Sequence, residues 1–242
     1  MVGSFLNVCI IRLPKAESIV FPGSHCPYCK KAIEFYDNIP LISYLLLRAK
    51  CRHCHAPISF QYPLIEGITA LCSLLLFIKF GLSWNYLFYF SFIAALIVIT
   101  VIDFFHQIIP DVISLPGIGL GLLGSLILSQ ITFFNSLIGV VLGGGSLFLV
   151  ATLYQWFFKR EGMGGGDVKL LAMIGAFLGW KAVFLTILLS SLIGSITGVA
   201  TMAFKGKDFK YAIPFGPFLS LGAVVSLFWG ENLINWYLYI NR

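Results

Sequence analysis

The sequence contains few charged residues, which make up 11% of its 242 residues against roughly 25% in an ordinary soluble domain. It also lacks a recognisable cleavable signal peptide, because the apolar stretch from Val2 to Ile11 has no basic segment before it and no small-residue cleavage site after it. Hydrophobic residues make up 59% of the chain, and the mean hydropathy is +0.93. The scarcity of charge excludes an ordinary soluble domain and predicts an all-α, polytopic membrane protein.

Long apolar runs alternate with short polar segments along the chain. After an apolar N-terminal piece, the runs cover residues 63–80, 85–102, 111–129, 132–158, 168–180, 181–203 and 214–238, although 168–180 is short for a crossing. Because about 20 apolar residues cross a bilayer as a helix, we expect about eight transmembrane helices. The predicted division is a short first span at 1–14, a small extramembrane domain at 15–62 and a membrane domain at 63–242. Glycine-rich patches at 117–124 and 143–145 are expected to let helices approach closely.

Lysine and arginine residues are unevenly divided between the two faces of this arrangement. Of the 16 residues, 13 lie on the face that carries residues 15–62, and Lys79, Lys181 and Arg242 lie on the other. Because Lys and Arg concentrate in the cytoplasmic loops of membrane proteins, we expect residues 15–62 to lie in the cytoplasm, between the first and second spans.

Two aspartates lie at the ends of apolar runs on this same face. Asp103 ends a run in the segment VIDFFHQIIPD, and Asp167 follows Gly164, Gly165 and Gly166 and precedes another run. An ionisable residue at membrane depth is costly and is by default a functional hypothesis. The orientation was assigned from Lys and Arg alone, so the shared face of the two acids independently supports a carboxylate pair. The alternative is that each acid only caps or ends its helix at the interface.

Four of the six cysteines form two C-x-x-C pairs, Cys26 with Cys29 and Cys51 with Cys54, separated by 21 residues. Two such knuckles predict a closed, four-thiolate zinc site with a structural role, and a reducing cytoplasm disfavours disulfides. Redox-active or free thiols are the alternative. Three histidines beside the knuckles offer substitute ligands, but we interpret them as solvated loop residues: His25, His53 and His55. The other two cysteines, Cys9 and Cys72, lie in apolar runs and are interpreted as small packing residues.

Three further acids have simpler interpretations. Glu66 lies near the start of the run 63–80 and is expected in the first turn of that helix, where a carboxylate suits the helix dipole. Asp111 follows Pro110 at the start of the next run but one and is placed to cap it. Glu231 is expected at the outer interface of the last run.

With these residues placed, the chain resembles the bacterial type IV prepilin peptidases over nearly its whole length. The resemblance rests on Gly3-Ser-Phe-Leu-Asn-Val with Arg12-Leu-Pro14, both cysteine knuckles, Asp37-Asn-Ile-Pro40 with Ser43-Tyr44, Tyr62-Pro63 with Glu66, Asp103 with Pro110-Asp111, and Gly164-Gly-Gly-Asp167. In that family the catalytic aspartates match Asp103 and Asp167, and the second belongs to a G-x-G-D pattern shared with presenilin-like intramembrane proteases. The resemblance makes Gly164, Gly166, Pro110 and Asp111 the expected supporting residues.

The resemblance implies a two-step activity at the cytoplasmic side of the bacterial inner membrane. A leader peptide is cleaved after a glycine from the prepilins and pseudopilins of type IV pilus and type II secretion systems. The new N-terminus is then methylated with S-adenosylmethionine as co-substrate. We expect zinc to be structural, no nucleic-acid partner, and a cofactor pocket formed or supported by Asp37, Asn38 and Glu66; no glycine fingerprint of a soluble methyltransferase is visible. The alternatives are a peptidase without methylation and a non-catalytic transporter with a zinc-ribbon domain.

Overall fold

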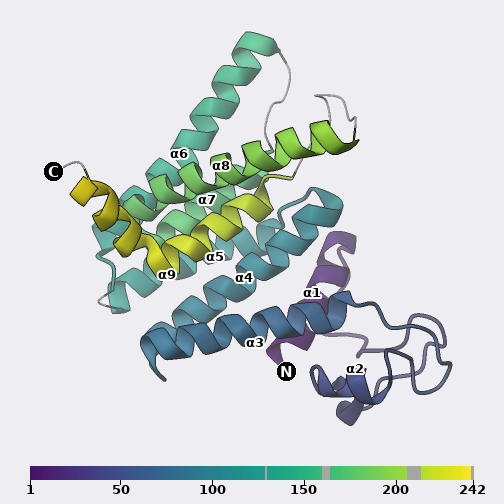
Figure 1. Cartoon of the computed structure of the whole chain (residues 1–242). Helices are drawn as coiled ribbons and strands as arrows, with labels where there is room; N and C mark the ends of the chain where they lie inside the picture. The colour runs from purple at the N-terminus through teal and green to yellow at the C-terminus, as the bar shows by residue number, and fades with distance from the viewer. Residues whose placement is uncertain (129, 160–163, 206–213, 241–242) are drawn as a thin grey trace. The chain divides into compact units, whose positions relative to one another are not determined.

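A computed structural model of the chain describes residues 1–128, 130–159, 164–205 and 214–240, apart from the side chains of residues 35, 38, 204–205 and 238–240 (Figure 1). The helices are α1 (Val2–Arg12), α2 (Ile42–Leu46), α3 (Gln61–Phe80), α4 (Trp84–His106), α5 (Asp111–Ile127), α6 (Phe133–Phe158), α7 (Gly165–Leu178), α8 (Trp180–Lys205) and α9 (Gly216–Ile240). In these residues there is no β-strand, and only two isolated bridges occur, His25 with Ala32 and Lys50 with Pro57. The predicted all-α class is confirmed.

Each of the eight predicted apolar segments forms a helix. Five of them, α3, α4, α6, α8 and α9, are long and apolar enough to cross a membrane. The other three are shorter: α5 has 17 residues, α7 has 14, and α1 has 11. The segment predicted at 168–180 is α7, which begins three residues earlier and ends at Leu178 because Gly179 has a φ of +77°.

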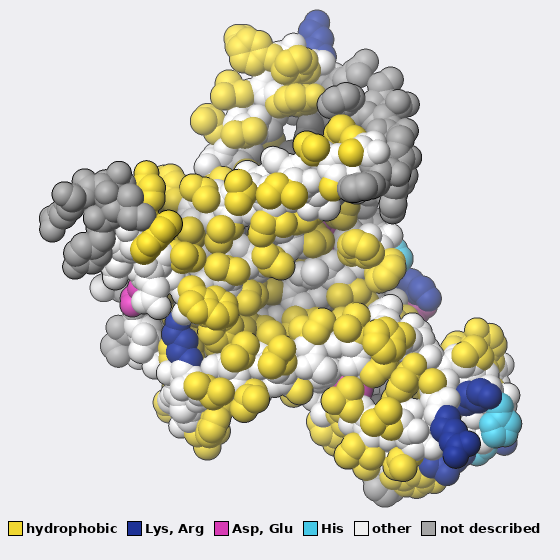
Figure 2. Space-filling view, viewed as in Figure 1, with side chains coloured by type: hydrophobic (Ala, Val, Ile, Leu, Met, Phe, Trp, Pro, Cys, Tyr) yellow, Lys and Arg dark blue, Asp and Glu magenta, His cyan; other side chains and the backbone are white. Residues whose placement is uncertain are grey.

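The chain forms two compact units, Met1–Val98 and Ile99–Arg242. In the first unit, α1 packs on α3, and Gly3 lies so close to α3 that a Cβ there would be 2.8 Å from the Cα of Glu66. The segment between these helices contains the knuckles and α2. Hydrophobic side chains cover the helices on the face in Figure 2, and Lys, Arg and His side chains gather over the segment that carries α2.

In the second unit, α7 forms the core. Every residue from Leu170 to Phe177 is buried, and α5, α6, α8 and α9 all pack against this helix. Glycines make the close contacts: Gly139 of α6 meets the backbone of Gly175, and a Cβ at Gly143 would lie 2.5 Å from the Leu171 carbonyl oxygen. A Cβ at Gly121 of α5 would lie 2.6 Å from the Cβ of Ala176. The prediction that the glycine-rich patches allow close helix approach is confirmed.

Candidate active site and metal centre

The second unit brings the two predicted acids, Asp103 and Asp167, together. Asp103 lies in the last turn of α4 with 5% of its surface exposed, and Asp167 lies in the first turn of α7. The two helix ends are close enough that a negative charge on Asp103 disfavours one on Asp167. Two carboxylates in such proximity do not both ionise easily, so a pair of this kind shares a proton.

A backbone amide holds Asp103 from a third helix. The N–H of Gly216, at the start of α9, donates a hydrogen bond of 2.9 Å to Oδ2 of Asp103. Sequence reasoning missed this residue. Pro214 and Pro217 on either side of Gly216 mark the start of a helix, but they do not indicate what the amide contacts.

The glycines before Asp167 pack against the loop that follows Asp103. Gly164 is the N-cap of α7, and its carbonyl oxygen accepts a hydrogen bond of 3.2 Å from the N–H of Asp167. A Cβ at Gly166 would lie 2.8 Å from the Cβ of Ile109, a residue that is 8% exposed. A side chain at Gly166 would therefore push the segment after Asp103 away from the start of α7.

The predicted supporting residues Pro110 and Asp111 begin α5. Pro110 is the N-cap and Asp111 the first helical residue, so the interpretation of Asp111 as a side-chain cap is wrong. Its carboxylate instead accepts hydrogen bonds of 2.7 and 2.8 Å from Nζ of Lys169 on α7. This ion pair ties the beginning of α5 to the beginning of α7.

The four knuckle cysteines form a cluster that is able to hold a metal ion. Their sulfur atoms all lie within 4.8 Å of one another. The two knuckles have the same backbone turn: the N–H of Lys30 donates to the carbonyl oxygen of Cys26 at 2.9 Å, and that of His55 donates to Cys51 at 3.0 Å. Lys30 and His55 both have positive φ values, 60° and 55°. The predicted four-cysteine site is thus assembled by two equivalent turns.

The turns also favour thiolates, which are the form that binds metal. The Cys29 amide is directed at the sulfur of Cys26 and lowers the pKa of that thiol to about 6. The Cys54 amide lowers the pKa of the Cys51 thiol in the same way. The Ala56 amide acts in this direction on Cys54 too, but burial and the sulfurs of the other three cysteines outweigh it and raise the pKa of the Cys54 thiol to about 11. Among the described residues, no histidine joins this cluster, in agreement with the prediction that His25, His53 and His55 are loop residues.

Glu66 of α3 forms a tie between α1 and the segment that carries the knuckles. Its Oε1 accepts a hydrogen bond of 2.5 Å from the hydroxyl of Ser4 on α1, and its Oε2 accepts one of 2.9 Å from the N–H of Leu41. Both oxygens therefore have partners within the first unit. The prediction that Glu66 lies in the first turn of its helix is wrong, because α3 already begins at Gln61 and its first turn contains no acidic residue. The partners of the carboxylate were not predicted.

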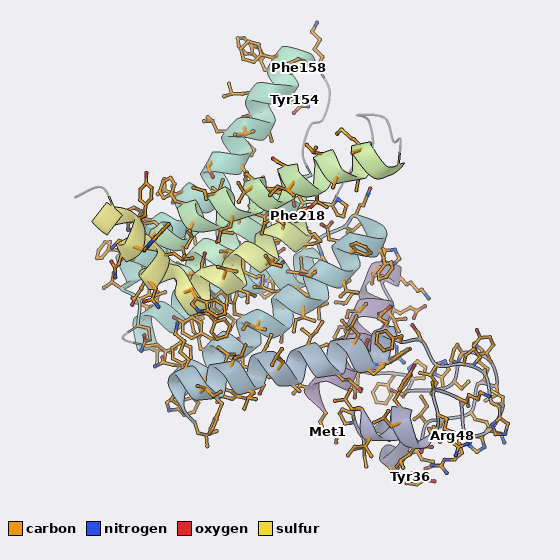
Figure 3. All side chains as sticks on the ribbon, viewed as in Figure 1. Met1, Tyr36, Arg48, Tyr154, Phe158 and Phe218 are labelled. Atoms are coloured by element: carbon orange, nitrogen blue, oxygen red, sulfur yellow. The ribbon has the colours of Figure 1, made fainter. Side chains whose placement is uncertain are left out.

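Asp37 has a partner on the second knuckle. Arg52 donates hydrogen bonds of 2.8 and 2.6 Å to its two carboxylate oxygens, and this lowers the pKa of the Asp37 carboxyl below its ordinary value. The Arg52 guanidinium also lies 5.4 Å from the centroid of the Tyr36 ring. Tyr36 is labelled in Figure 3, as is Arg48 of the same segment. Asn38 follows in the same short helical turn, but its side chain lies outside the described part of the structure.

An open hollow of about 350 Å³ adjoins the second knuckle. Its walls include Leu46 and Cys51, and three basic side chains contribute to it: Arg48, Lys50 and Arg52. A hollow with this lining offers both apolar contact and a place for a small anionic group.

Comparison with known proteins matches both parts of the chain. The model of the bacterial peptidase A24 N-terminal domain matches residues 1–80, and that of the type IV leader peptidase family matches residues 90–199. A prepilin leader peptidase/N-methyltransferase of Aeromonas hydrophila is 37% identical over 266 residues, which cover 98% of this chain and 90% of the relative. Proteins of the same name from Pseudomonas aeruginosa (40% identical over 261 residues; 98% and 90% covered) and Stutzerimonas stutzeri (38% over 269; 100% and 92%) are similar throughout. No solved structure gives a significant match.

Proposed function

The chain belongs to the type IV leader peptidase family, and we propose that it cleaves the leader peptide of prepilins and methylates the new N-terminus. The observation that carries the proposal is the pair of acids. Asp103 is buried at the end of α4, and Asp167 lies at the start of α7, where the neighbouring Gly166 packs on Ile109 of the loop that follows Asp103. The four-cysteine cluster and the length of the similarity to relatives with both activities in their names support the second step.

The proposed cleavage is aspartic proteolysis. The ionised carboxylate of the pair takes a proton from a water molecule. The oxygen of that water attacks the carbonyl carbon of the glycine at the end of the leader. The protonated carboxyl donates a hydrogen bond to the carbonyl oxygen, and a proton is then delivered to the departing amine. Gly166 supports this site by leaving room for the side chain of Ile109, and Gly164 accepts a hydrogen bond from the N–H of Asp167. The Asp111–Lys169 pair holds α5 and α7 together beside the site.

The proposed location is the inner membrane of a bacterium, with the acid pair at the cytoplasmic side. This placement is supported by the distribution of Lys and Arg, of which 13 of 16 lie on the face of Asp103 and Asp167. In the proposed division, residues 1–14 form a short first span, residues 15–62 a cytoplasmic methyltransferase part, and residues 63–242 the peptidase. Prepilins and pseudopilins are the proposed substrates.

We propose that zinc occupies the four-cysteine cluster and has a structural role, because four thiolates close the coordination sphere and leave no position for a reactant. Cys26, Cys29, Cys51 and Cys54 would hold the ion and join the two turns of the segment. The donor set fits, since the sulfur atoms of all four cysteines lie within 4.8 Å of one another.

The hollow beside the second knuckle is the proposed location for part of S-adenosylmethionine. Arg48, Lys50 and Arg52 suit the carboxylate of that co-substrate, and the neighbouring leucines suit its apolar parts. Asp37 and Glu66 then act as supports: Asp37 fixes Arg52, and Glu66 fixes the start of α2. Supporting roles fit these two acids, because their oxygens already accept hydrogen bonds from the protein.

The proposed function is tested with the purified full chain in lipid nanodiscs, supplied with a purified prepilin and labelled S-adenosylmethionine. We expect release of the leader and transfer of label to the shortened product. A folded protein that leaves the prepilin intact would refute the peptidase. A protein that instead couples ion flux to a substrate, and needs both acids for it, would support the transporter alternative. Cleavage without transfer of label would support the alternative of a peptidase only.

A further inference from the structure

The start of α9 is built around the carboxylate of Asp103. Gly216, its first residue, lies 113 positions beyond Asp103 in the sequence, and both residues are buried. The hydrogen bond from the Gly216 N–H to Oδ2 of Asp103, at 2.9 Å, is therefore shielded from water. A shielded hydrogen bond to a carboxylate is stronger than one at a surface and fixes the orientation of the group that accepts it.

Position 216 has no room for a side chain. A Cβ there would lie 2.6 Å from Oδ2 of Asp103, 3.2 Å from its Cγ and 3.4 Å from its Cβ. The φ of Gly216 lies outside the left-handed region, so an L-residue could adopt the backbone conformation. The requirement for glycine therefore comes from the approach of the carboxylate.

The packing of α9 keeps Gly216 in this position. The rings of Phe215 and Phe218 lie next to Gly194 of α8, with Phe218 labelled on α9 in Figure 3. Further along, a Cβ at Gly222 would lie 3.0 Å from the carbonyl oxygen of Thr186, so the two helices are in close contact there as well. The amide thus projects from a start of helix that is fixed against α8.

We propose that Gly216 is a positioning residue of the peptidase, which holds Asp103 so that its second oxygen faces the water and the scissile carbonyl. This inference rests on the proposed function of the acid pair. Because Oδ2 accepts the amide hydrogen, the proton shared by the pair lies on Oδ1 of Asp103 or on Asp167, and proton transfer in the reaction falls to these oxygens. Gly216 itself touches neither water nor substrate in this scheme.

The test uses Gly216→Ala in the full chain, with kcat and KM measured for a prepilin in nanodiscs. A displaced carboxylate should lower kcat by about 100-fold, because misplacing a reacting group by about 1 Å has an effect of this size. The KM should stay within about twofold, since no group that binds the substrate is changed. The thermal unfolding midpoint of this variant in nanodiscs should match wild type and report an intact peptidase unit, because methylation is assigned to the other compact unit.

Two other glycines of α9 serve as matched controls. Gly230→Ala introduces a Cβ at an ordinary distance of 3.7 Å from Leu185 and should leave kcat unchanged. Gly222→Ala presses on the Thr186 backbone and should lower thermal stability together with cleavage. If Gly216→Ala cleaves at the wild-type rate, or loses thermal stability together with cleavage as Gly222→Ala does, the inference is overturned. Asp103→Asn in the same assay tests the proposed function separately from the role of Gly216. If Asp103→Asn still cleaves the prepilin, the proposed function itself fails.

Discussion

Lys169 and Asp111 form an ion pair in which Nζ lies 2.7 and 2.8 Å from the two carboxylate oxygens. Lys169 is two residues beyond Asp167 on α7, and Asp111 is the first residue of α5. The pair therefore fixes these two helix starts next to the proposed dyad. The two side chains are 38% and 55% exposed, so solvent screening limits the contribution of the pair to stability, typically to about 0–1 kcal/mol.

This arrangement separates three aspartates by role. We predict that Asp103→Asn and Asp167→Asn each abolish leader cleavage while the protein still inserts, because the amide keeps the shape but removes the charge and the exchangeable proton. Asp111→Asn should retain cleavage within about tenfold, since it weakens only an exposed ion pair. Leader cleavage is measured in membranes with matched amounts of each variant. Full cleavage by either of the first two variants would contradict the assignment of the dyad.

Residue types and spacing were enough to predict the four converging cysteines and the helical segments. The hydrogen bond from Gly216 to Asp103 was not predictable, because every residue except proline carries the same N–H and only the packing of α9 selects this one. The tie from Glu66 to Leu41 depends on a loop conformation in which Leu41 has a φ of +61°. In both cases the contact is made between residues far apart in the sequence, and the residues next to either group do not indicate its partner.

We predict that the purified protein contains one zinc per chain and that Cys51→Ser with Cys54→Ser removes it, because hydroxyls are poor replacements for thiolates. Elemental analysis measures the metal. A folded and active preparation without zinc would refute the assignment.

The same double variant separates the two activities. The cysteine cluster lies in the segment with the proposed co-substrate hollow, and the acid pair lies in the other compact unit. Methylation should therefore fall further than cleavage when the zinc is lost. The measurement is the ratio of methylated to unmethylated mature product at equal cleavage. Normal methylation of every cleaved product would show that the methyl-transfer site lies elsewhere in the chain.

Glu66 should be required to hold the segment that carries α2. Glu66→Gln replaces one of the two acceptor oxygens with an NH₂ group, which can only donate. Either the Ser4 hydroxyl or the Leu41 N–H therefore loses its acceptor. Hydrogen bonds to charged groups contribute about 1.5–3 kcal/mol, so the segment should open more often and be cut faster by added protease. Ser4→Ala is the matched control, because it removes only the contact with α1. Wild-type protease resistance in Glu66→Gln would contradict this role.

The contact between Gly139 and Gly175 should limit the stability of the peptidase unit. A methyl group at either position meets the backbone of the facing helix, so Gly139→Ala or Gly175→Ala should separate α6 from α7 and destabilise the protein by about 1–3 kcal/mol or more. Gly145→Ala on the same α6 is the control, since a Cβ there meets nothing within 4 Å. Thermal unfolding in nanodiscs checks this, and equal unfolding midpoints for Gly175→Ala and Gly145→Ala would be evidence against the close contact.

Mass spectrometry of a prepilin co-expressed with the full chain tests the central claim most directly, because it reports cleavage and methylation on one molecule. With the wild-type chain, we predict a product that has lost its leader up to a glycine and has gained the mass of one methyl group at its new N-terminus. With Asp103→Asn, the prepilin should remain at full length. A full-length, unmodified prepilin beside abundant and folded wild-type protein would contradict the account.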